Sequence, residues 1–201
     1  MPYSVVRKFE KTIAEYCGAR HGVAVSSCTN AIFLCLIWYR HAFSETPEIQ
    51  LPSRTYIGVA CSAINAGYKV EFDKDRWKGS YWLSPLAIRD SALQFKRDMH
   101  KSGFTCISFH IRKHIPIGRG GMILTDDGNA AEWLRKARYD GREEKAMQDQ
   151  RDFDISGYNM YMSPDQAARG LQLFDLIKDK DLPDMDDYET YPDLTQYRIF
   201  K

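Results

Sequence analysis

The 201-residue chain lacks an excess of charge of either sign, because 28 lysine and arginine residues are balanced by 27 aspartate and glutamate residues. Such a balance provides no overall field that would attract nucleic acid or a membrane surface, so binding to either is not expected. The sequence also lacks an apolar run of about 18 residues, and we expect no transmembrane helix. Its first residues have no apolar centre of the kind found in signal peptides, and we therefore expect a cytoplasmic protein.

Cysteine is scarce and follows no metal-binding pattern. The five cysteines are odd in number, and their spacing matches no zinc motif. Several have apolar neighbours, as Cys35 does within the run Phe-Leu-Cys-Leu-Ile. We expect reduced, mostly buried thiols and no metal site. The cysteines are Cys17, Cys28, Cys35, Cys61 and Cys106.

The chain does contain a regular alternation of strand and helix patterns. Such alternation is typical of an α/β fold with a mostly parallel sheet, and the length suffices for one domain with a sizeable core. Helical spacing or apolar character predicts helices over residues 5–16, 31–42, 56–66, 129–139 and 163–177. Short apolar runs predict strands over residues 21–26, 48–52, 69–72, 104–109 and 121–125.

A polar turn, residues 26–30 (Ser-Ser-Cys-Thr-Asn), lies between the first predicted strand and the helix that follows. A turn at this place can bind phosphate, because free backbone N–H groups point out of a helix start. An ordinary helix cap by serine or threonine explains the same residues, and taken alone it is the simpler interpretation.

One lysine stands at the end of a predicted strand in residues 108–113 (Ser-Phe-His-Ile-Arg-Lys), followed by a glycine-rich loop over residues 118–122. A lysine delivered in this way can form a Schiff base with an aldehyde cofactor, and a nearby serine can bind the cofactor's phosphate. A loop lysine is otherwise a solvated surface charge. The neighbouring cations can instead recognise phosphates; they are His110, Arg112, His114 and Arg119.

The order Ser-Phe-His-x-x-Lys followed by Gly-x-Gly-Gly-Met resembles the lysine segment of the nucleotide-sugar aminotransferases of the DegT type, which use pyridoxal 5'-phosphate (PLP). The resemblance implies that Lys113 is the Schiff-base lysine and that Ser108 binds the cofactor phosphate. It also implies a three-layer α/β sandwich, a reduced version of the fold type I large domain, over residues 1–178.

The family's small C-terminal domain is expected to be absent. In its place we expect an acidic, aromatic tail over residues 179–201, which either packs as an ordered arm or binds a partner. The stretch between Phe72 and Asp90 is also shorter than in the family. We expect Trp77, Tyr81 and Trp82 to fill the core where strands are missing.

Four further segments resemble cofactor-binding segments of the family, and two of them lie within residues 26–56. The turn over residues 26–30 resembles Ser-Ser-Gly-Thr-Ala, which implies phosphate binding by Cys28 and Thr29, with Cys28 in the place of the glycine. Residues 51–56 resemble Pro-Ser-Phe-Thr-Phe, which implies that Tyr56 stacks on the pyridine ring; packing at a helix start is the alternative.

Residues 90–94 (Asp-Ser-Ala-Leu-Gln) resemble the family's Asp-Ala-Ala-Gln/His. The resemblance implies that Asp90 faces the pyridine nitrogen and keeps it protonated, although an aspartate after a strand is otherwise often a plain cap. Gln94 is the candidate contact to the ring hydroxyl, one position late because Leu93 stands at the family's polar position.

Residues 157–171 resemble the family segment Gly-Tyr-Asn-Tyr-Arg-Met-Ser, continued by a helix. The resemblance implies that Asn159 reaches the cofactor phosphate of a neighbouring subunit, and hence a homodimer with a shared site. Tyr161 occupies the usual arginine position. The alternative is a plain loop and a helix capped by Ser163 and Pro164.

Taken together, the resemblance implies a PLP-dependent aminotransferase that acts on a sugar or nucleotide-linked keto substrate with an amino donor, glutamate by family analogy. Lys113 and Asp90 are the expected catalytic residues. Two alternatives stay open: a PLP-dependent decarboxylase or eliminase acting on a modified nucleotide or amino acid, and a degenerate, non-catalytic partner protein. The departures at Cys28, Leu93 and Tyr161 favour the last, whereas the Ser108–Lys113 pair and Asp90 oppose it.

Overall fold

The central strands are two five-residue segments whose residues are all buried, β6 (Phe104–Ser108) and β7 (Gly121–Thr125). Burial on both faces is the pattern of an inner strand, and the apolar composition of both segments allows it. The computed structural model describes residues 3–44, 46–145, 149–150 and 152–200. Residues 1–2, 45, 146–148 and 151 of the predicted domain and residue 201 of the predicted tail therefore lie outside the described residues.

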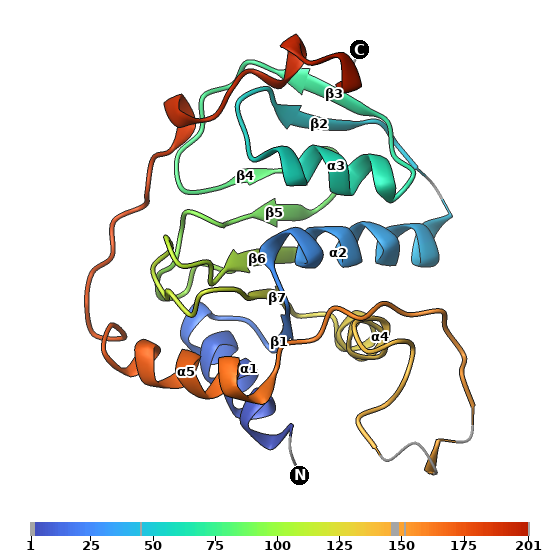
Figure 1. Ribbon diagram of the computed structural model, residues 1–201, viewed down its shortest axis with the longest axis vertical. Helices are drawn as coiled ribbons and strands as arrows, with labels where there is room; N and C mark the ends of the chain where they lie inside the picture. The colour runs from blue at the N-terminus through green and yellow to red at the C-terminus, as the bar shows by residue number, and fades with distance from the viewer. Residues whose placement is uncertain (1–2, 45, 146–148, 151, 201) are drawn as a thin grey trace.

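These two strands belong to a five-stranded sheet of order β1-β7-β6-β5-β4 (Figure 1). The remaining strands of this sheet are β1 (His21–Val25), β4 (Tyr81–Trp82) and β5 (Ile88–Asp90). A second, two-stranded sheet pairs β2 (Ile49–Pro52) with β3 (Val70–Asp73).

The strand directions are mixed, so the expectation of a mostly parallel sheet is wrong. In the five-stranded sheet β5 and β6 are parallel, whereas β1–β7, β6–β7 and β4–β5 are antiparallel. Parallel neighbours require a crossover connection, usually a helix. The link over residues 83–87 is too short for such a crossover, so β5 returns antiparallel to β4. The links over residues 91–103 and 109–120 both lack a helix, yet the first leads to a parallel neighbour and the second to an antiparallel one.

Helices cover both faces of the sheet, which confirms the α/β three-layer arrangement (Figure 1). Two hydrophobic clusters lie on opposite faces: Ile123 of β7 packs in one, whereas its neighbours Met122 and Leu124 pack in the other. The first cluster includes α2 (Cys28–Phe43), α3 (Ile57–Asn65) and α4 (Gly128–Ala137). The second includes α1 (Ser4–Cys17) and α5 (Pro164–Asp175). All five predicted helices and all five predicted strands lie within three residues of these bounds.

Between β3 and β5 the chain forms one further strand, the short β4. Tyr81 is buried and Trp77 is partly buried against the core, with their ring centroids 4.7 Å apart, so both fill the core as expected. Trp82 is 42% exposed, and the prediction that it fills the core is wrong. Side chains alternate along a strand, so the burial of Tyr81 turns its neighbour towards solvent.

The segment after α5 runs along the edge of the molecule towards β3 (Figure 1). Tyr188 and Leu194 are buried, and the rings of Phe72 and Phe200 lie 5.4 Å apart, so this aromatic segment is an ordered arm. Within the described residues, no helix is both long and apolar enough to cross a membrane. The arm carries the 3-10 turns η2 (Tyr188–Thr190), η3 (Leu194–Gln196) and η4 (Arg198–Phe200).

Candidate active site

The candidate active site lies where β5 and β6 end together. The two strands are parallel, so Asp90 and Ser108 reach the same edge of the sheet, beside the start of α2. A cavity of about 770 Å³ opens at this place. Six of the eight predicted site residues line it: Cys28, Thr29, Tyr56, Asp90, Ser108 and Lys113.

Asp90 places a buried carboxyl group in the wall of this cavity, with the residue only 5% exposed. Its Oδ1 accepts a hydrogen bond from the Ala92 amide at 2.9 Å and its Oδ2 accepts one from the Tyr81 hydroxyl at 3.0 Å. Burial raises the pKa of the Asp90 carboxyl, although these hydrogen bonds and the charge of Lys113 oppose the shift. Because two carboxyl oxygens offer about four acceptor positions, Asp90 can accept a further donor from the cavity.

Tyr81 fixes the orientation of that carboxyl group. Its hydroxyl lies 2.6 Å from Thr55 Oγ1 as well as 3.0 Å from Asp90 Oδ2. Burial, followed by the charge of Asp90, raises the pKa of Tyr81 well above its usual value, so the hydroxyl stays protonated and donates to Asp90. Thr55, Tyr81 and Asp90 therefore form one buried hydrogen-bonded chain.

Lys113 lies across the same cavity on the loop between β6 and β7. The side chain is 9% exposed, and its Nζ lies 3.6 Å from Asp187 Oδ2. The loop is closed by backbone bonds, including one from the Phe109 amide to the Gly120 carbonyl at 2.9 Å. Gly120 has a φ of 156°, in the region that side chains avoid, which explains a glycine at the end of this loop.

The turn before α2 forms the third wall. Ser27 caps the helix, because its side chain accepts a hydrogen bond from the Asn30 amide at 3.1 Å. Burial raises the pKa of the Cys28 thiol well above its usual value, and the nearby Asp90 adds to the shift, so the thiol is neutral. A Cβ at Gly121 would collide with the backbone of Ser27 and Cys28, and the glycine thus lets β7 pack closely beneath this turn.

Tyr56 also lines the cavity, immediately before α3, and is 53% exposed. Two predicted site residues lie outside the cavity lining. Gln94 is buried, and its Nε2 donates to Asp184 Oδ2 at 2.8 Å, while Leu93 lines the cavity in its place.

Asn159 is exposed, and its Nδ2 donates to Asp140 Oδ2 at 3.2 Å. The residue after Asn159 nonetheless contacts the turn that is predicted to bind phosphate, since the Ser26 amide donates to the Met160 carbonyl at 2.8 Å. A role for Asn159 in a neighbouring subunit's site stays a prediction.

Sequence reasoning missed four residues of the site: Thr55, Tyr81, Asp187 and Tyr191. Thr55 lies within the segment that singled out Tyr56, so its position next to that aromatic residue was an available signal. Tyr81 was expected only to fill the core. Nothing in the local pattern around Asp187 and Tyr191 indicates that they return to a lysine far earlier in the chain.

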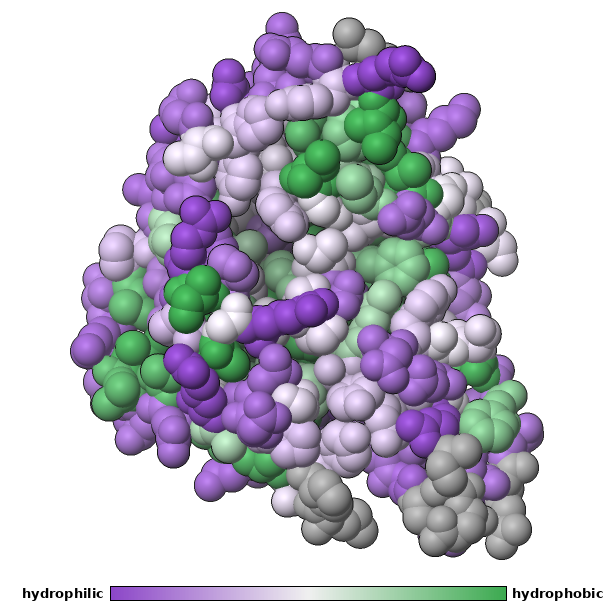
Figure 2. All heavy atoms as spheres, viewed as in Figure 1, coloured by the Kyte–Doolittle hydropathy of each residue, from purple (hydrophilic) through white to green (hydrophobic). Residues whose placement is uncertain are grey.

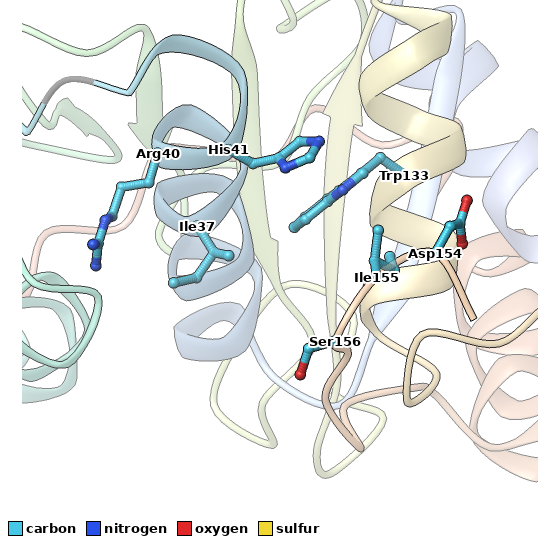
Figure 3. Close-up of a pocket in the computed structure, with 7 residues that line it drawn as sticks. All are labelled: Ile37, Arg40, His41, Trp133, Asp154, Ile155 and Ser156. Atoms are coloured by element: carbon cyan, nitrogen blue, oxygen red, sulfur yellow. The ribbon is translucent and has the colours of Figure 1, made fainter.

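A second, shallower hollow of about 410 Å³ lies at the other end of α2 (Figure 3). Its main feature is the His41 ring stacked on Trp133, with ring centroids 5.0 Å apart. None of the predicted site residues lines this hollow. Its lining consists of Ile37, Arg40, His41, Trp133, Asp154, Ile155 and Ser156.

The fold around the Lys113 cavity is that of sugar aminotransferases. The chain matches sugar aminotransferase CalS13 from Micromonospora echinospora with a TM-score of 0.73 at 15% identity, covering 86% of this chain and 60% of that chain. It matches AtS13 from Actinomadura melliaura with a TM-score of 0.75 at 18% identity, covering 89% of this chain and 61% of that chain. These likenesses confirm the expected fold.

The chain belongs to the DegT/DnrJ/EryC1/StrS aminotransferase family, whose model matches residues 1–97 and 87–181. It is 27% identical over 207 residues to GDP-perosamine synthase of Caulobacter vibrioides, a match that covers 82% of this chain and 54% of the relative. The chain thus spans about half the length of the curated relatives it matches. The family resemblance inferred from the lysine segment is confirmed.

Proposed function

We propose that this protein is a PLP-dependent aminotransferase acting on a sugar or nucleotide-linked keto substrate. The observation that carries the proposal is the convergence of Asp90, Ser108 and Lys113 on one cavity, from a parallel strand pair and the loop that follows it. Family membership supports the same activity.

The residues of the cavity fit the three reactive or charged groups of PLP: its pyridine nitrogen, its phosphate and its aldehyde. A buried carboxyl group with spare acceptor capacity, Asp90, suits the pyridine nitrogen. The Thr29 and Ser108 hydroxyls, together with the first amides of α2, suit the phosphate. The Lys113 amine suits the aldehyde. A volume of about 770 Å³ is within the range of small-molecule sites.

Each residue then has a defined task. When bound, PLP supplies an electron sink for the substrate carbon. Asp90 holds the ring nitrogen, and Tyr81 keeps the Asp90 carboxyl group oriented. Ser108, Thr29 and the backbone of Cys28 bind the phosphate, while Tyr56 covers one face of the ring. Lys113 holds and moves a proton at Nζ, as a general acid and base.

The proposed assembly is a homodimer, with Asn159 contributing to the site of the neighbouring subunit. Figure 2 shows hydrophobic residues gathered over α3. Ile57 and Ile64 of this helix are 45% and 42% exposed, and Tyr56 stands beside them at the rim of the cavity. An apolar surface of this kind, continuous with a site, supports burial against a second copy.

A cytoplasmic location is part of the proposal. It is supported by the free state of Cys17, Cys28, Cys35, Cys61 and Cys106, since thiols stay reduced in that compartment.

The test is an absorbance titration of the purified protein with PLP. A visible band from the lysine–PLP link is expected, together with its loss in Lys113→Ala and its retention in Lys101→Ala, an exposed lysine that serves as the control. Addition of glutamate should convert the band to that of the aminated cofactor. Absence of a band at any PLP concentration would reject the proposal, and a band unaffected by all amino donors would favour a different PLP reaction.

A further inference from the structure

Residues 183–194, which we call the strap, follow α5 along the edge of the molecule (Figure 1). The strap contributes Tyr191 to the lining of the Lys113 cavity, and its backbone makes three contacts with residues far earlier in the chain. The Pro183 carbonyl lies 3.0 Å from His114 Nε2, the Met185 amide donates to Leu93 at 2.9 Å, and the Leu194 amide donates to Ser53 at 2.8 Å. The strap is therefore held twice near its beginning and once at its end.

Charged and buried side chains add to this attachment. Asp184 accepts from Gln94 at 2.8 Å and pairs with Lys96 at 3.3 Å. Asp186 pairs with Arg76 at 3.0 Å. The burial of Tyr188 and Leu194, described above, shows that the strap belongs to the folded body and does not merely lie on it.

One side chain of the strap lines the cavity, and a second pairs with a lysine that lines it. The carboxylate of Asp187 lies 3.6 Å from Lys113 Nζ, and Tyr191 lines the cavity with its ring stacked on Trp77 at 6.2 Å. Burial, with the charges of Asp187 and Asp90, raises the pKa of Tyr191 to about 12, so this phenol is neutral at physiological pH. The charge that the strap brings to the cavity is therefore that of Asp187.

The other ionisable groups facing Lys113 do not duplicate this role. Asp90 bonds to Tyr81 and the Ala92 amide and forms no ion pair with Lys113 within the described residues, and the Cys28 thiol is neutral. In the described part of the chain, Asp187 is the carboxylate within ion-pair distance of the amine. The remaining ionisable lining residues are the exposed Tyr56 and three potential cations, His110, Arg112 and Arg119.

We propose that the strap forms part of the active site and that Asp187 is a positioning residue for Lys113. Its carboxylate holds the Lys113 side chain in place by the 3.6 Å ion pair until a ligand displaces that pair. An amine engaged in an ion pair is not free to attack a carbonyl, so Asp187 restrains the reactivity of Lys113. This inference rests on the proposed function, in which Lys113 is the reactive amine.

The test measures the reactivity of Lys113 without PLP. The cofactor-free protein is labelled with acetic anhydride over a pH series, and acetylation of Lys113 is quantified by peptide mass spectrometry. In Asp187→Asn the labelling rate at pH 8 should rise at least about threefold, because the amine is released from its ion pair. Asp187→Glu should restore the wild-type profile. Glu189→Gln, which removes an exposed charge of the same strap, should leave it unchanged.

A variant-free arm covers the case in which Asp187→Asn does not fold. Raising NaCl from about 0.05 M to about 1 M screens the wild-type ion pair and should raise Lys113 labelling at pH 8 in the same direction. If labelling is insensitive both to salt and to loss of Asp187, or if Glu189→Gln has the same effect as Asp187→Asn, the inference is wrong.

The result is separable from that of the PLP titration. A changed Lys113 profile without a PLP band would support the strap's role and reject the proposed function. A PLP band with an unchanged profile would support the proposed function and reject the role of Asp187.

Discussion

The Tyr81 hydroxyl donates to Asp90 Oδ2 at 3.0 Å, from a two-residue strand that pairs with the strand carrying Asp90. The short link between β3 and β5 therefore does more than close the sheet. It supplies the residue that orients the buried carboxyl group of the candidate site.

Tyr81→Phe is expected to lower the free energy of unfolding by about 1–2 kcal/mol, because Asp90 loses a donor and Thr55 loses its partner while both stay buried. Urea unfolding of the cofactor-free protein measures the change. Tyr197→Phe, at an exposed position, should have no measurable effect. Equal stability of Tyr81→Phe and wild type would contradict the hydrogen-bonded chain described above.

Asp90→Asn is expected to raise stability while weakening PLP binding. Burial raises the pKa of Asp90, so its contribution to stability is fully present below the unfolded value of about 4 and is lost as the pH rises through the folded value. A neutral amide avoids that loss. The variant should gain on the order of 1 kcal/mol at pH 7 and little at pH 4.

Urea unfolding at both pH values measures this difference, and Asp75→Asn, at an exposed position, is the matched control. A gain of equal size at pH 4 and pH 7 would show that the titration of Asp90 is not its cause. Weaker PLP binding is expected because an amide cannot hold a protonated pyridine nitrogen.

Glu10→Gln is expected to cost about 3–5 kcal/mol, because Arg7, Arg135 and the buried Arg138 lose the carboxylate they share, and Arg138 keeps only Glu144 as a charge partner. Burial raises the pKa of Glu10, but Arg138 and Arg7 outweigh it and the net shift is downward. Its contribution is therefore present above the unfolded value of about 4.3 and is lost as the pH falls through the folded value.

Urea unfolding over a pH series should thus show a flatter acid dependence for Glu10→Gln than for wild type. Glu15→Gln, whose partner Lys11 is exposed, should change stability by less than about 0.5 kcal/mol. Similar losses in both variants would argue against a special role for the buried pair.

Gly121→Ala is expected to cost about 1–3 kcal/mol, because the added methyl group collides with the turn before α2. Since that turn carries Cys28 and Thr29, PLP affinity should fall as well. Gly128→Ala is the matched control: its Cβ would meet only His21 Nε2, at 3.5 Å, and the change should be neutral or slightly stabilising. Thermal unfolding of the two variants compares them, and a stable Gly121→Ala would show that the turn can shift.

The local sequence pattern predicted the elements well and their directions poorly. Apolar runs and helical spacing identified each predicted helix and strand, because these signals depend on neighbouring residues. Strand direction depends on where the chain returns, and a link such as residues 109–120 has no periodicity that reveals its path.

The site shows the same division. The family resemblance brought Asp90, Ser108 and Lys113 together correctly as neighbours in one cavity. It could not foresee that Asp184 would take the Gln94 amide or that Asp187 would pair with Lys113, because these contacts join the strap to loops far earlier in the sequence.

The small sheet of β2 and β3 depends on its surroundings for its order. A bridge between Gln50 and Ser84 links it to the main sheet, and residues 194–200 pack against it through the contacts of Leu194 with Ser53 and of Phe200 with Phe72. Two strands alone are marginally stable in water, so we expect the sheet of β2 and β3 and the end of the strap to open together.

A local unfolding event of this kind would withdraw Thr55, Tyr56 and Tyr191 from the cavity at once. Asp90 and Ser108 would stay in place on the buried pair β5 and β6. One part of the cavity wall, on β5 and β6, should therefore persist while the other part opens. Hydrogen exchange should find slow amides in β5 and β6, and faster amides that exchange together in β2, β3 and the end of the strap.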